Sequence, residues 1–156
     1  MHGTPLRAVT LAMPEPIGVL GIACPDERPL LACVAAFAAA TCVGNTVVLI
    51  PSEQHPLLAT DLYQVLDTSD LPGGVVNIVT GPRDALAKVL AEHNDVDAIW
   101  YFGGAEGSAA VERASVGNLK QTWVSNGQAR DWLRDDAAEF LRHATQVKYI
   151  WVPYGA

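Results

Sequence analysis

The sequence has little positive charge and no long apolar run, and each shortage argues against a class of protein. Only three of the 156 residues are lysine, the basic residues form no run, and the formal net charge is −7. Because neutralising phosphates needs clustered lysine and arginine, no nucleic-acid partner is expected. The longest apolar run, 30–43, is shorter than the roughly 18 residues that span a bilayer, so no membrane partner is expected either. It is typical instead of a fully buried helix.

Cysteine is also scarce, and no common catalytic or metal-binding motif is present. Cys24, Cys33 and Cys42 have no metal-ligand spacing, and their odd number suggests reduced thiols in a cytoplasmic protein. We expect all three to be small buried thiols. The sequence also lacks a GxGxxG fingerprint, a phosphate-binding P-loop, a nucleophile elbow and a carboxylate pair. Neither a metal site nor a familiar catalytic constellation is predicted.

What the sequence does contain is an alternation of strand-like and helical segments along one domain, residues 1–156. Short apolar runs bounded by glycine and proline predict strands, and longer periodic segments predict helices. The expected strands are 6–13, 17–24, 45–50, 75–80, 96–102, 119–124 and 145–153, and the expected helices are 29–43, 55–66, 82–93, 103–115 and 129–144. This alternation predicts an α/β fold with a mostly parallel five-stranded sheet and helices on both faces. Ligands bind beyond the C-terminal ends of such strands, so any site is expected there.

Several stretches carry a family resemblance. In order and spacing, "PEPIGVLGIACP", "VGNTVVLIPSEQHPL" and "LPGGVVNIVTG" resemble the strand–helix–strand core of the cofactor-binding domain of the aldehyde dehydrogenase superfamily. "YFGGAEGS" stands where that family has a turn of the type "FTGSTEVG", and "GNLKQTWVSNG" stands where it has the segment leading to "ELGG". The resemblance covers nearly the whole chain and implies a Rossmann-like fold.

The two ends of the sequence resemble the family's oligomerisation element. Residues 6–13 are similar to the second strand of its hairpin, and Gln146–Val152 is similar to its C-terminal tail strand. Between Gly127 and Ala144 the chain passes directly to that tail, so the resemblance implies that the catalytic domain is absent. A degenerate second copy of this kind is similar to the C-terminal part of family-16 aldehyde dehydrogenases.

The resemblance also allows the family's catalytic groups to be sought position by position, and none is found. The nucleophilic cysteine would follow Val124, where this sequence has no cysteine. The position of the oxyanion-donating asparagine is Glu27, an anion that would repel a developing oxyanion. The general base would fall at Ser125, whose hydroxyl cannot accept a proton near pH 7. We expect Ser125 to be a turn residue, and Asp26 and Glu27 to be acids at a helix N-terminus.

The family's cofactor contacts are only partly retained. A lysine and a glutamate hold the adenosine ribose in the family; here the lysine position is Ile50, while Glu53 is kept. Pro82 and Asp84 remove an N–H and add a negative charge where a pyrophosphate would lie. We expect Arg83 to be a solvated turn residue, and Glu53 an exposed residue in the first turn of a helix. The remaining candidate cofactor-binding residues are Pro51, Ser52, Glu53, Gly81, Gly103 and Gly104.

These expectations favour a non-catalytic aldehyde-dehydrogenase-like module that acts in assembly or regulation of a larger dehydrogenase polypeptide. The strand Gln146–Val152 would pair with a second copy or with a full-length dehydrogenase domain, because an unpaired strand edge favours pairing. One alternative is a regulatory domain that binds NAD(P) weakly through Glu53 and the glycines Gly103 and Gly104. The other alternative is a subunit of an active NAD-dependent dehydrogenase that a partner chain completes. We expect no tightly bound cofactor.

Overall fold

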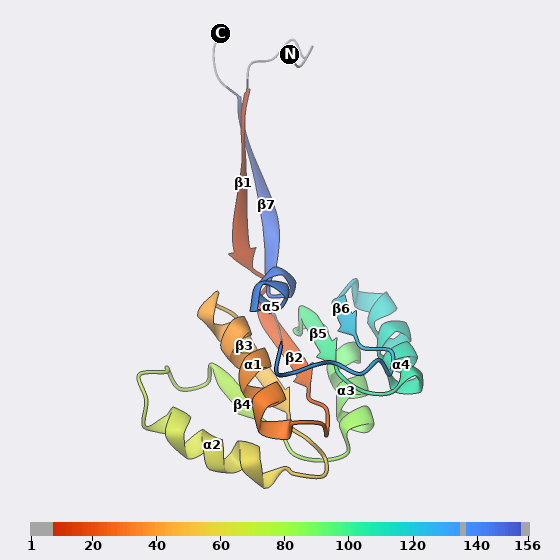
Figure 1. Ribbon diagram of the computed structural model, residues 1–156. Helices are drawn as coiled ribbons and strands as arrows, with labels where there is room; N and C mark the ends of the chain where they lie inside the picture. Colours follow the sequence, from red (N-terminus) through yellow and green to blue (C-terminus); the bar gives the residue numbers. More distant parts are fainter. Residues whose placement is uncertain (1–7, 135–136, 154–156) are drawn as a thin grey trace.

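The computed structural model describes residues 8–134 and 137–153, which form a layered body and a two-stranded ribbon that projects from it (Figure 1). The elements follow one another as β1 (Ala8–Pro16), β2 (Val19–Ala23), α1 (Pro29–Cys42), β3 (Thr46–Ile50), α2 (Leu57–Asp67), β4 (Val76–Ile78), α3 (Arg83–Glu92), β5 (Ala98–Tyr101), α4 (Ala105–Ser115), the 3-10 turn η1 (Val116–Asn118), β6 (Gln121–Val124), α5 (Ala137–His143) and β7 (Thr145–Pro153). The predicted strands and helices are therefore present, with several boundaries moved.

The body contains a five-stranded parallel sheet in the order β4-β3-β2-β5-β6. Strands β2, β3 and β4 build the sheet in one direction, and the chain then returns to place β5 on the other side of β2. The direction of winding thus reverses between β2 and β5. The prediction of an α/β fold with a mostly parallel five-stranded sheet is confirmed.

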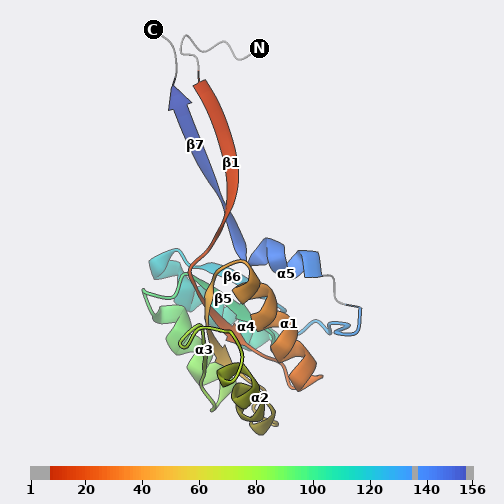
Figure 2. The same cartoon turned by 90° about the vertical axis from the view of Figure 1, so that its left-hand side faces the viewer.

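Helices cover both faces of this sheet because its strands alternate apolar side chains between the faces. On β5, Trp100 joins the core cluster that contains α1, whereas Ile99 joins the cluster that contains α3 and α4. Helices α1 and α2 therefore lie on one face, and α3 and α4 lie on the other (Figure 2). Gly21 allows α3 to approach β2 closely, since a Cβ there would lie 3.0 Å from the Leu90 side chain.

Helix α1 corrects one prediction, because it is not fully buried. Its alanine-rich face packs on the sheet, while Leu30 and Leu31 on its outer side are 43% and 39% exposed. Cys24 and Cys33 are buried as expected, but Cys42 is exposed. A nine-residue separation places Cys42 about half a turn from Cys33, on the uncovered side. In the described part of the chain, no helix is long and apolar enough to cross a membrane.

A second correction concerns the predicted helix 129–144, of which only α5 is helical. Residues 129–134 are not helical, and Ala137, the first residue of α5, is exposed. The rings of Trp132 and Phe140 meet, with centroids 6.1 Å apart, and the Arg130 guanidinium lies against both of them. Arg130 also forms an ion pair of 2.5 Å with Glu139. These contacts hold the non-helical segment against α5.

The ribbon consists of β1 and β7, paired antiparallel over nine residues of each strand. It extends away from the body in both views (Figures 1 and 2). The strands predicted at 6–13 and 146–152 correspond to it, although Leu6 and Arg7 lie outside the described residues. Near its base, Lys148 Nζ lies 3.0 Å from a carboxylate oxygen of Glu15.

Candidate functional site

A cleft of about 310 Å³ opens at the C-terminal ends of β2, β5 and β6. In an open α/β sheet the ligand crevice lies where the winding reverses, which here is between β2 and β5. The cleft occupies that place. Its walls come from the loops after these strands, from the start of α3 and from the segment before α5, and they include Asp26, Glu27, Arg83, Gly103, Gly104, Ser125, Arg130 and Trp132.

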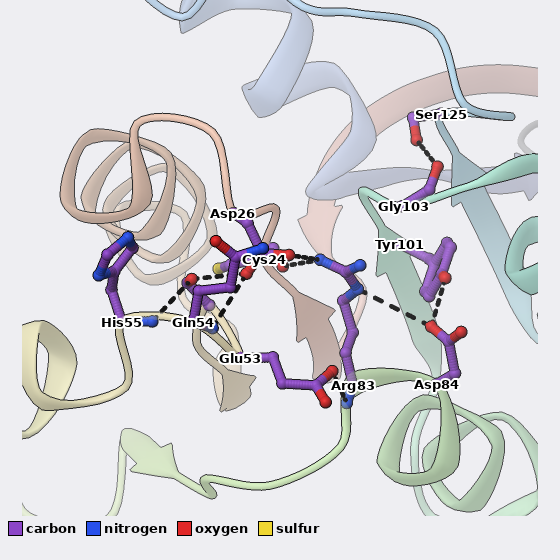
Figure 3. A network of polar contacts seen from close by, with 11 residues as sticks. Cys24, Asp26, Glu53, Gln54, His55, Arg83, Asp84, Tyr101, Gly103 and Ser125 are labelled. Atoms are coloured by element: carbon purple, nitrogen blue, oxygen red, sulfur yellow. Dashed lines mark hydrogen bonds and ion pairs between the residues drawn. The ribbon is translucent and has the colours of Figure 1, made fainter.

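Asp26 is the centre of a polar network at one side of this cleft (Figure 3). Its Oδ1 accepts hydrogen bonds from the Ser52 hydroxyl at 2.6 Å and from the Gln54 backbone N–H at 3.3 Å. Its Oδ2 lies 3.2 Å from Nη1 of Arg83. The expectation that Asp26 acts as a helix N-terminal acid is wrong, since these bonds go to the loop after β3 and to α3. Asp26 therefore joins three segments.

Arg83 is partly buried rather than solvated, which corrects the prediction for this residue. Its side chain is only 17% exposed, and Nη1 also donates to the carbonyl of Cys24 at 3.2 Å. Among the described residues, its buried Nε has no hydrogen-bond partner, although the Asp84 carboxylate lies 3.8 Å away. The Arg83 backbone N–H donates to the Glu53 carboxylate at 3.2 Å. The Arg83 guanidinium is thus held in place by an ion pair and a hydrogen bond to other residues of the same chain.

The network changes the acidity of two of its members. Burial raises the pKa of Asp26, but the hydrogen bonds from Ser52 and Gln54 and the charge of Arg83 outweigh it and lower the pKa overall. Burial and the hydrogen bond to Asp84 raise the pKa of Tyr101 to about 12. Asp26 is therefore ionised and Tyr101 is protonated at neutral pH. Neither side chain is suited to proton transfer near pH 7.

The glycines after β5 have a structural explanation. The Tyr101 ring lies against the start of α4, and its hydroxyl donates to Asp84 at 2.6 Å (Figure 3). A Cβ at Gly103 or Gly107 would lie 2.4 Å or 1.9 Å from the Tyr101 hydroxyl oxygen. At Gly104, in contrast, no atom lies within 4 Å of an added Cβ. Two of these glycines therefore make room for Tyr101, and their presence does not require a bound phosphate.

The candidate cofactor-binding residues fall into separate places. Gly103 and Gly104 line the cleft, whereas Glu53 and Gly81 line a different hollow of about 360 Å³. Pro51 and Ser52 are buried at the end of β3. Glu53 lies in a bend before α2, not in its first turn as predicted.

Two positions that the resemblance assigns to catalytic groups lie together at the cleft. Glu27 and Ser125 both line it, and the Ser125 hydroxyl donates to the carbonyl of Gly103 at 2.8 Å. The thiol at this edge of the sheet, Cys24, is fully buried, and its hydrogen bond with Cys33 and its burial raise its pKa well above the ordinary value. Because the thiolate is the reactive form, this cysteine is not an activated nucleophile.

The sequence named Asp26 and Arg83 but not their roles in the cleft, and it gave no role to Tyr101 or Arg130. Asp26 and Arg83 are 57 positions apart, and no local pattern pairs them. A usable signal was the placement of an acid two residues after one predicted strand and of a base three residues after another. Within the residues described, no group of three or more histidine, cysteine or acidic side chains could hold a metal ion.

Comparison with known proteins identifies the family. The model of the aldehyde dehydrogenase family matches residues 3–146. The chain belongs to the aldehyde dehydrogenase family. It is 39% identical over 113 residues to a betaine aldehyde dehydrogenase of Bacillus subtilis, which covers 72% of this chain and 23% of that one. It is 34% identical over 125 residues to the NADP/NAD-dependent aldehyde dehydrogenase PuuC of Escherichia coli, covering 80% and 25%.

Solved aldehyde dehydrogenase structures have the same Rossmann-like fold. A gamma-glutamyl-gamma-aminobutyraldehyde dehydrogenase of Burkholderia cenocepacia matches with a TM-score of 0.71 and 35% identity over 78% of this chain and 25% of that one. An indole-3-acetaldehyde dehydrogenase of P. syringae in complex with NAD+ matches with a TM-score of 0.72 and 32% identity, also over 78% and 25%. The chain spans about a quarter of the length of these relatives.

Proposed function

We propose that this chain is a non-catalytic aldehyde-dehydrogenase-like module that assembles with a second copy, or with a full-length dehydrogenase domain, through its ribbon. The observation that carries the proposal is the ribbon itself, which holds large apolar side chains in water. Val9, Leu11 and Met13 of β1 are 46–47% exposed, and Val152 of β7 is 48% exposed. Exposed apolar surface of this kind marks an interaction site.

The two faces of the ribbon differ, and one of them suits self-association better. Residues directly paired in an antiparallel ribbon lie on the same face. The register pairs Val9 with Val152 and Leu11 with Ile150, and Met13 continues the same face, so five aliphatic side chains form one strip. The opposite face mixes Thr10 and Ala12 with the aromatic residues of β7. The aliphatic strip is the proposed contact surface.

The cleft supports the absence of catalysis. The positions of the oxyanion donor and the general base hold Glu27 and Ser125, and Cys24 remains a buried thiol. Aldehyde oxidation by a covalent route needs a thiolate, an oxyanion donor and a base at one place. An active subunit completed by a partner chain would have to receive all three groups from that partner. We also propose a cytoplasmic location, since Cys24, Cys33 and Cys42 are all free thiols.

Light scattering coupled to size-exclusion chromatography tests the assembly proposal on the full chain. The expected result is a mass above that of the monomer that rises with protein concentration. The double variant Leu11→Glu and Ile150→Lys keeps a favourable cross-strand pair but removes the centre of the aliphatic strip, so it should be monomeric. The matched control, Ala12→Glu and Tyr149→Lys, makes the same change on the opposite face and should keep the assembly. A monomer at all concentrations would contradict self-association.

A second candidate function is weak NAD(P) binding by a regulatory domain. The observation that favours it is the hollow of about 360 Å³ beside Glu53 and Gly81, because an acidic residue after a strand can accept bonds from ribose hydroxyls. Titration calorimetry with NAD+ tests it. Binding tighter than roughly millimolar, about −4 kcal/mol, that is lost in Glu53→Ala and kept in Glu92→Ala would establish this candidate. Equal titration of the two variants would reject it.

A further inference from the structure

The ribbon is joined to the body by two short connections, which we call its roots. The first root is Ile17 and Gly18, between β1 and β2, and the second root is Ala144, between α5 and β7. Ile17 is 9% exposed and Ala144 is fully buried, so both roots lie within the body. Pro16 pairs with Thr145 at the base of the ribbon, which brings the two roots side by side. The contacts of these roots therefore set the direction in which the ribbon leaves the body.

The side chain of Asn45 forms hydrogen bonds with both roots. Asn45 lies between α1 and β3 and is 1% exposed. Its Oδ1 accepts a hydrogen bond from the Gly18 N–H at 2.9 Å. Its Nδ2 donates to the carbonyl of Ala144 at 2.8 Å and to the carbonyl of Ala40, in the last turn of α1, at 3.0 Å. One buried side chain thus connects both roots of the ribbon to a helix of the body.

The backbone groups around Asn45 require a side-chain amide. Two of them are carbonyls and the third is an N–H, and an amide presents two donor hydrogens and an acceptor oxygen on one planar group. A carboxylate would keep the bond to Gly18 but would bring an oxygen against the two carbonyls. An apolar side chain would leave the Gly18 N–H and the Ala144 carbonyl without this partner, which is costly in a buried place.

The first root has further hydrogen bonds besides the one to Asn45. The Thr46 N–H donates to the carbonyl of Gly18 at 3.0 Å, and the Val19 N–H donates to Oδ2 of Asp97 at 2.8 Å. Gly18 has a φ of +131°, and a Cβ there would lie 2.3 Å from Oδ2 of Asp97, so a side chain is excluded. This root is therefore expected to stay attached to the sheet when the Asn45 amide is removed.

The second root depends more strongly on Asn45. The N–H of Ala144 donates to the carbonyl of Phe140 at 2.9 Å, and the Thr145 hydroxyl donates to the carbonyl of Leu141 at 3.0 Å. Both of these bonds return to α5, whereas the bond from Asn45 connects the root to the residue that precedes β3. Removal of the amide would release the β7 side of the ribbon while the β1 side stays attached. The ribbon would then pivot about its first root.

We propose that Asn45 is a positioning residue for assembly, because its amide fixes the direction in which the ribbon leaves the body. The proposal rests on the proposed function, in which the aliphatic strip of the ribbon is the contact surface. A ribbon held in one direction associates without first losing conformational freedom, which strengthens binding. A ribbon that pivots presents the strip in the competent orientation for only a fraction of the time, which weakens the apparent affinity.

Residual dipolar couplings of the nitrogen-15-labelled full chain in a dilute aligned medium test this role. The chain carries Leu11→Glu and Ile150→Lys, so the ribbon is measured in a monomer. The couplings of β1 and β7 and those of the five-stranded sheet should fit one alignment tensor. With Asn45→Asp added, the ribbon should require a separate tensor of smaller magnitude. One tensor for the chain with Asn45→Asp, or two tensors already without it, would overturn the proposal.

Asn118→Asp is the matched control, because Asn118 also connects two segments through its amide, but within the body. Its Nδ2 donates to the carbonyl of Ala91 at 3.0 Å, and its Oδ1 accepts from the Lys120 N–H at 3.3 Å. This variant should lower the unfolding midpoint and keep one tensor, which is also the result that a merely structural role of Asn45 would give. If Asn45→Asp does not fold, Asn45→Ser replaces it, since a single hydroxyl hydrogen cannot serve both carbonyls. One tensor for Asn45→Ser would equally overturn the proposal.

Light scattering over a series of protein concentrations tests the consequence for assembly, with the original ribbon. Asn45→Asp should raise the dissociation constant about tenfold, as when each of two copies holds the competent orientation about a third of the time. Asn118→Asp should leave the dissociation constant unchanged. An unchanged value in Asn45→Asp would overturn the role in assembly. A chain that never self-associates would contradict the proposed function instead, and the dipolar couplings would still decide whether Asn45 fixes the ribbon.

Discussion

The ribbon and the cleft differ in how far their groups are satisfied within the chain. At the cleft, Asp26 bonds three segments and the Arg83 guanidinium is bound to the chain's own carboxylate and carbonyl. On the ribbon, large apolar side chains such as Leu11 and Trp151 remain about half exposed. Among the described residues, most polar groups at the cleft are bonded within the chain, with the buried Arg83 Nε as an exception, whereas the exposed surface of the ribbon is apolar. This difference is the one expected if the chain assembles through its ribbon, as proposed.

The largest expected effect tests whether the cleft network stabilises the body. Asp26→Ala removes the acceptor of two hydrogen bonds and of the Arg83 ion pair, and it leaves partly buried donors without a partner. The expected loss is about 2–3 kcal/mol in the free energy of unfolding, measured with urea. Glu27→Ala, at the neighbouring exposed position, is the control and should cost less than about 0.5 kcal/mol. If both variants unfold alike, the cleft is not held together by Asp26.

A second prediction concerns the glycines that face Tyr101. Gly107→Ala places a Cβ 1.9 Å from the Tyr101 hydroxyl oxygen, so the ring must move and its hydrogen bond to Asp84 is strained. We expect a loss of about 1–3 kcal/mol, as for other overpacked sites. Gly104→Ala is the matched control, because its added Cβ meets nothing within 4 Å and its φ of −66° suits alanine. Thermal unfolding compares the two. Equal stability of the two variants would show that α4 shifts without cost.

A third prediction follows from the acidity of Asp26. Its pKa in the folded chain lies below the ordinary value of about 3.9, so the ionised carboxylate stabilises the folded state at neutral pH. This contribution is complete above the unfolded-state pKa and is lost as the pH falls below about 4 through the folded-state pKa. Asp26→Asn should therefore lose less stability than the original chain between about pH 5 and 3. Parallel urea titrations at these pH values measure the difference, and parallel pH curves would contradict the assignment.

The body of the fold was predictable because its signals are local. Apolar runs between glycine and proline marked the strands of the sheet, and their ends marked the place of the cleft. The segment 129–134 was not predictable, because its periodic apolar residues favour a helix, whereas in the structure it is not helical and Trp132 packs against the Phe140 ring and the Arg130 guanidinium. Periodicity cannot distinguish residues that share a helix face from residues that meet through tertiary contact.

The site was predictable in position but not in chemistry. The strand ends correctly placed Glu27 and Ser125 at one cleft, whereas the pairing of Asp26 with Arg83 joins a loop to the start of α3, two segments that are distant in sequence. Gly103 and Gly104 suggested a cofactor site, although Gly103, together with Gly107, makes room for the Tyr101 ring. A glycine in the sequence can indicate that a neighbouring group leaves no room for a side chain. Only the three-dimensional structure shows which group that is.

The smallest expected effect concerns an exposed lysine–glutamate ion pair on the ribbon and a similar pair on the body. Lys148 pairs with Glu15 on the ribbon at 3.0 Å, and Lys88 pairs with Glu92 on α3 at 3.6 Å; all four side chains are at least 36% exposed. In the monomer, Lys148→Met and Lys88→Met should each cost about 0.2–0.5 kcal/mol, measured by urea unfolding at low protein concentration. If the ribbon assembles, its pair becomes less hydrated, so the cost of Lys148→Met should change at high protein concentration. The cost of Lys88→Met should stay constant. If the loss in free energy of unfolding does not depend on protein concentration for either variant, the ion pair of the ribbon lies outside any interface. The contrast between the ribbon and the body would then be weaker.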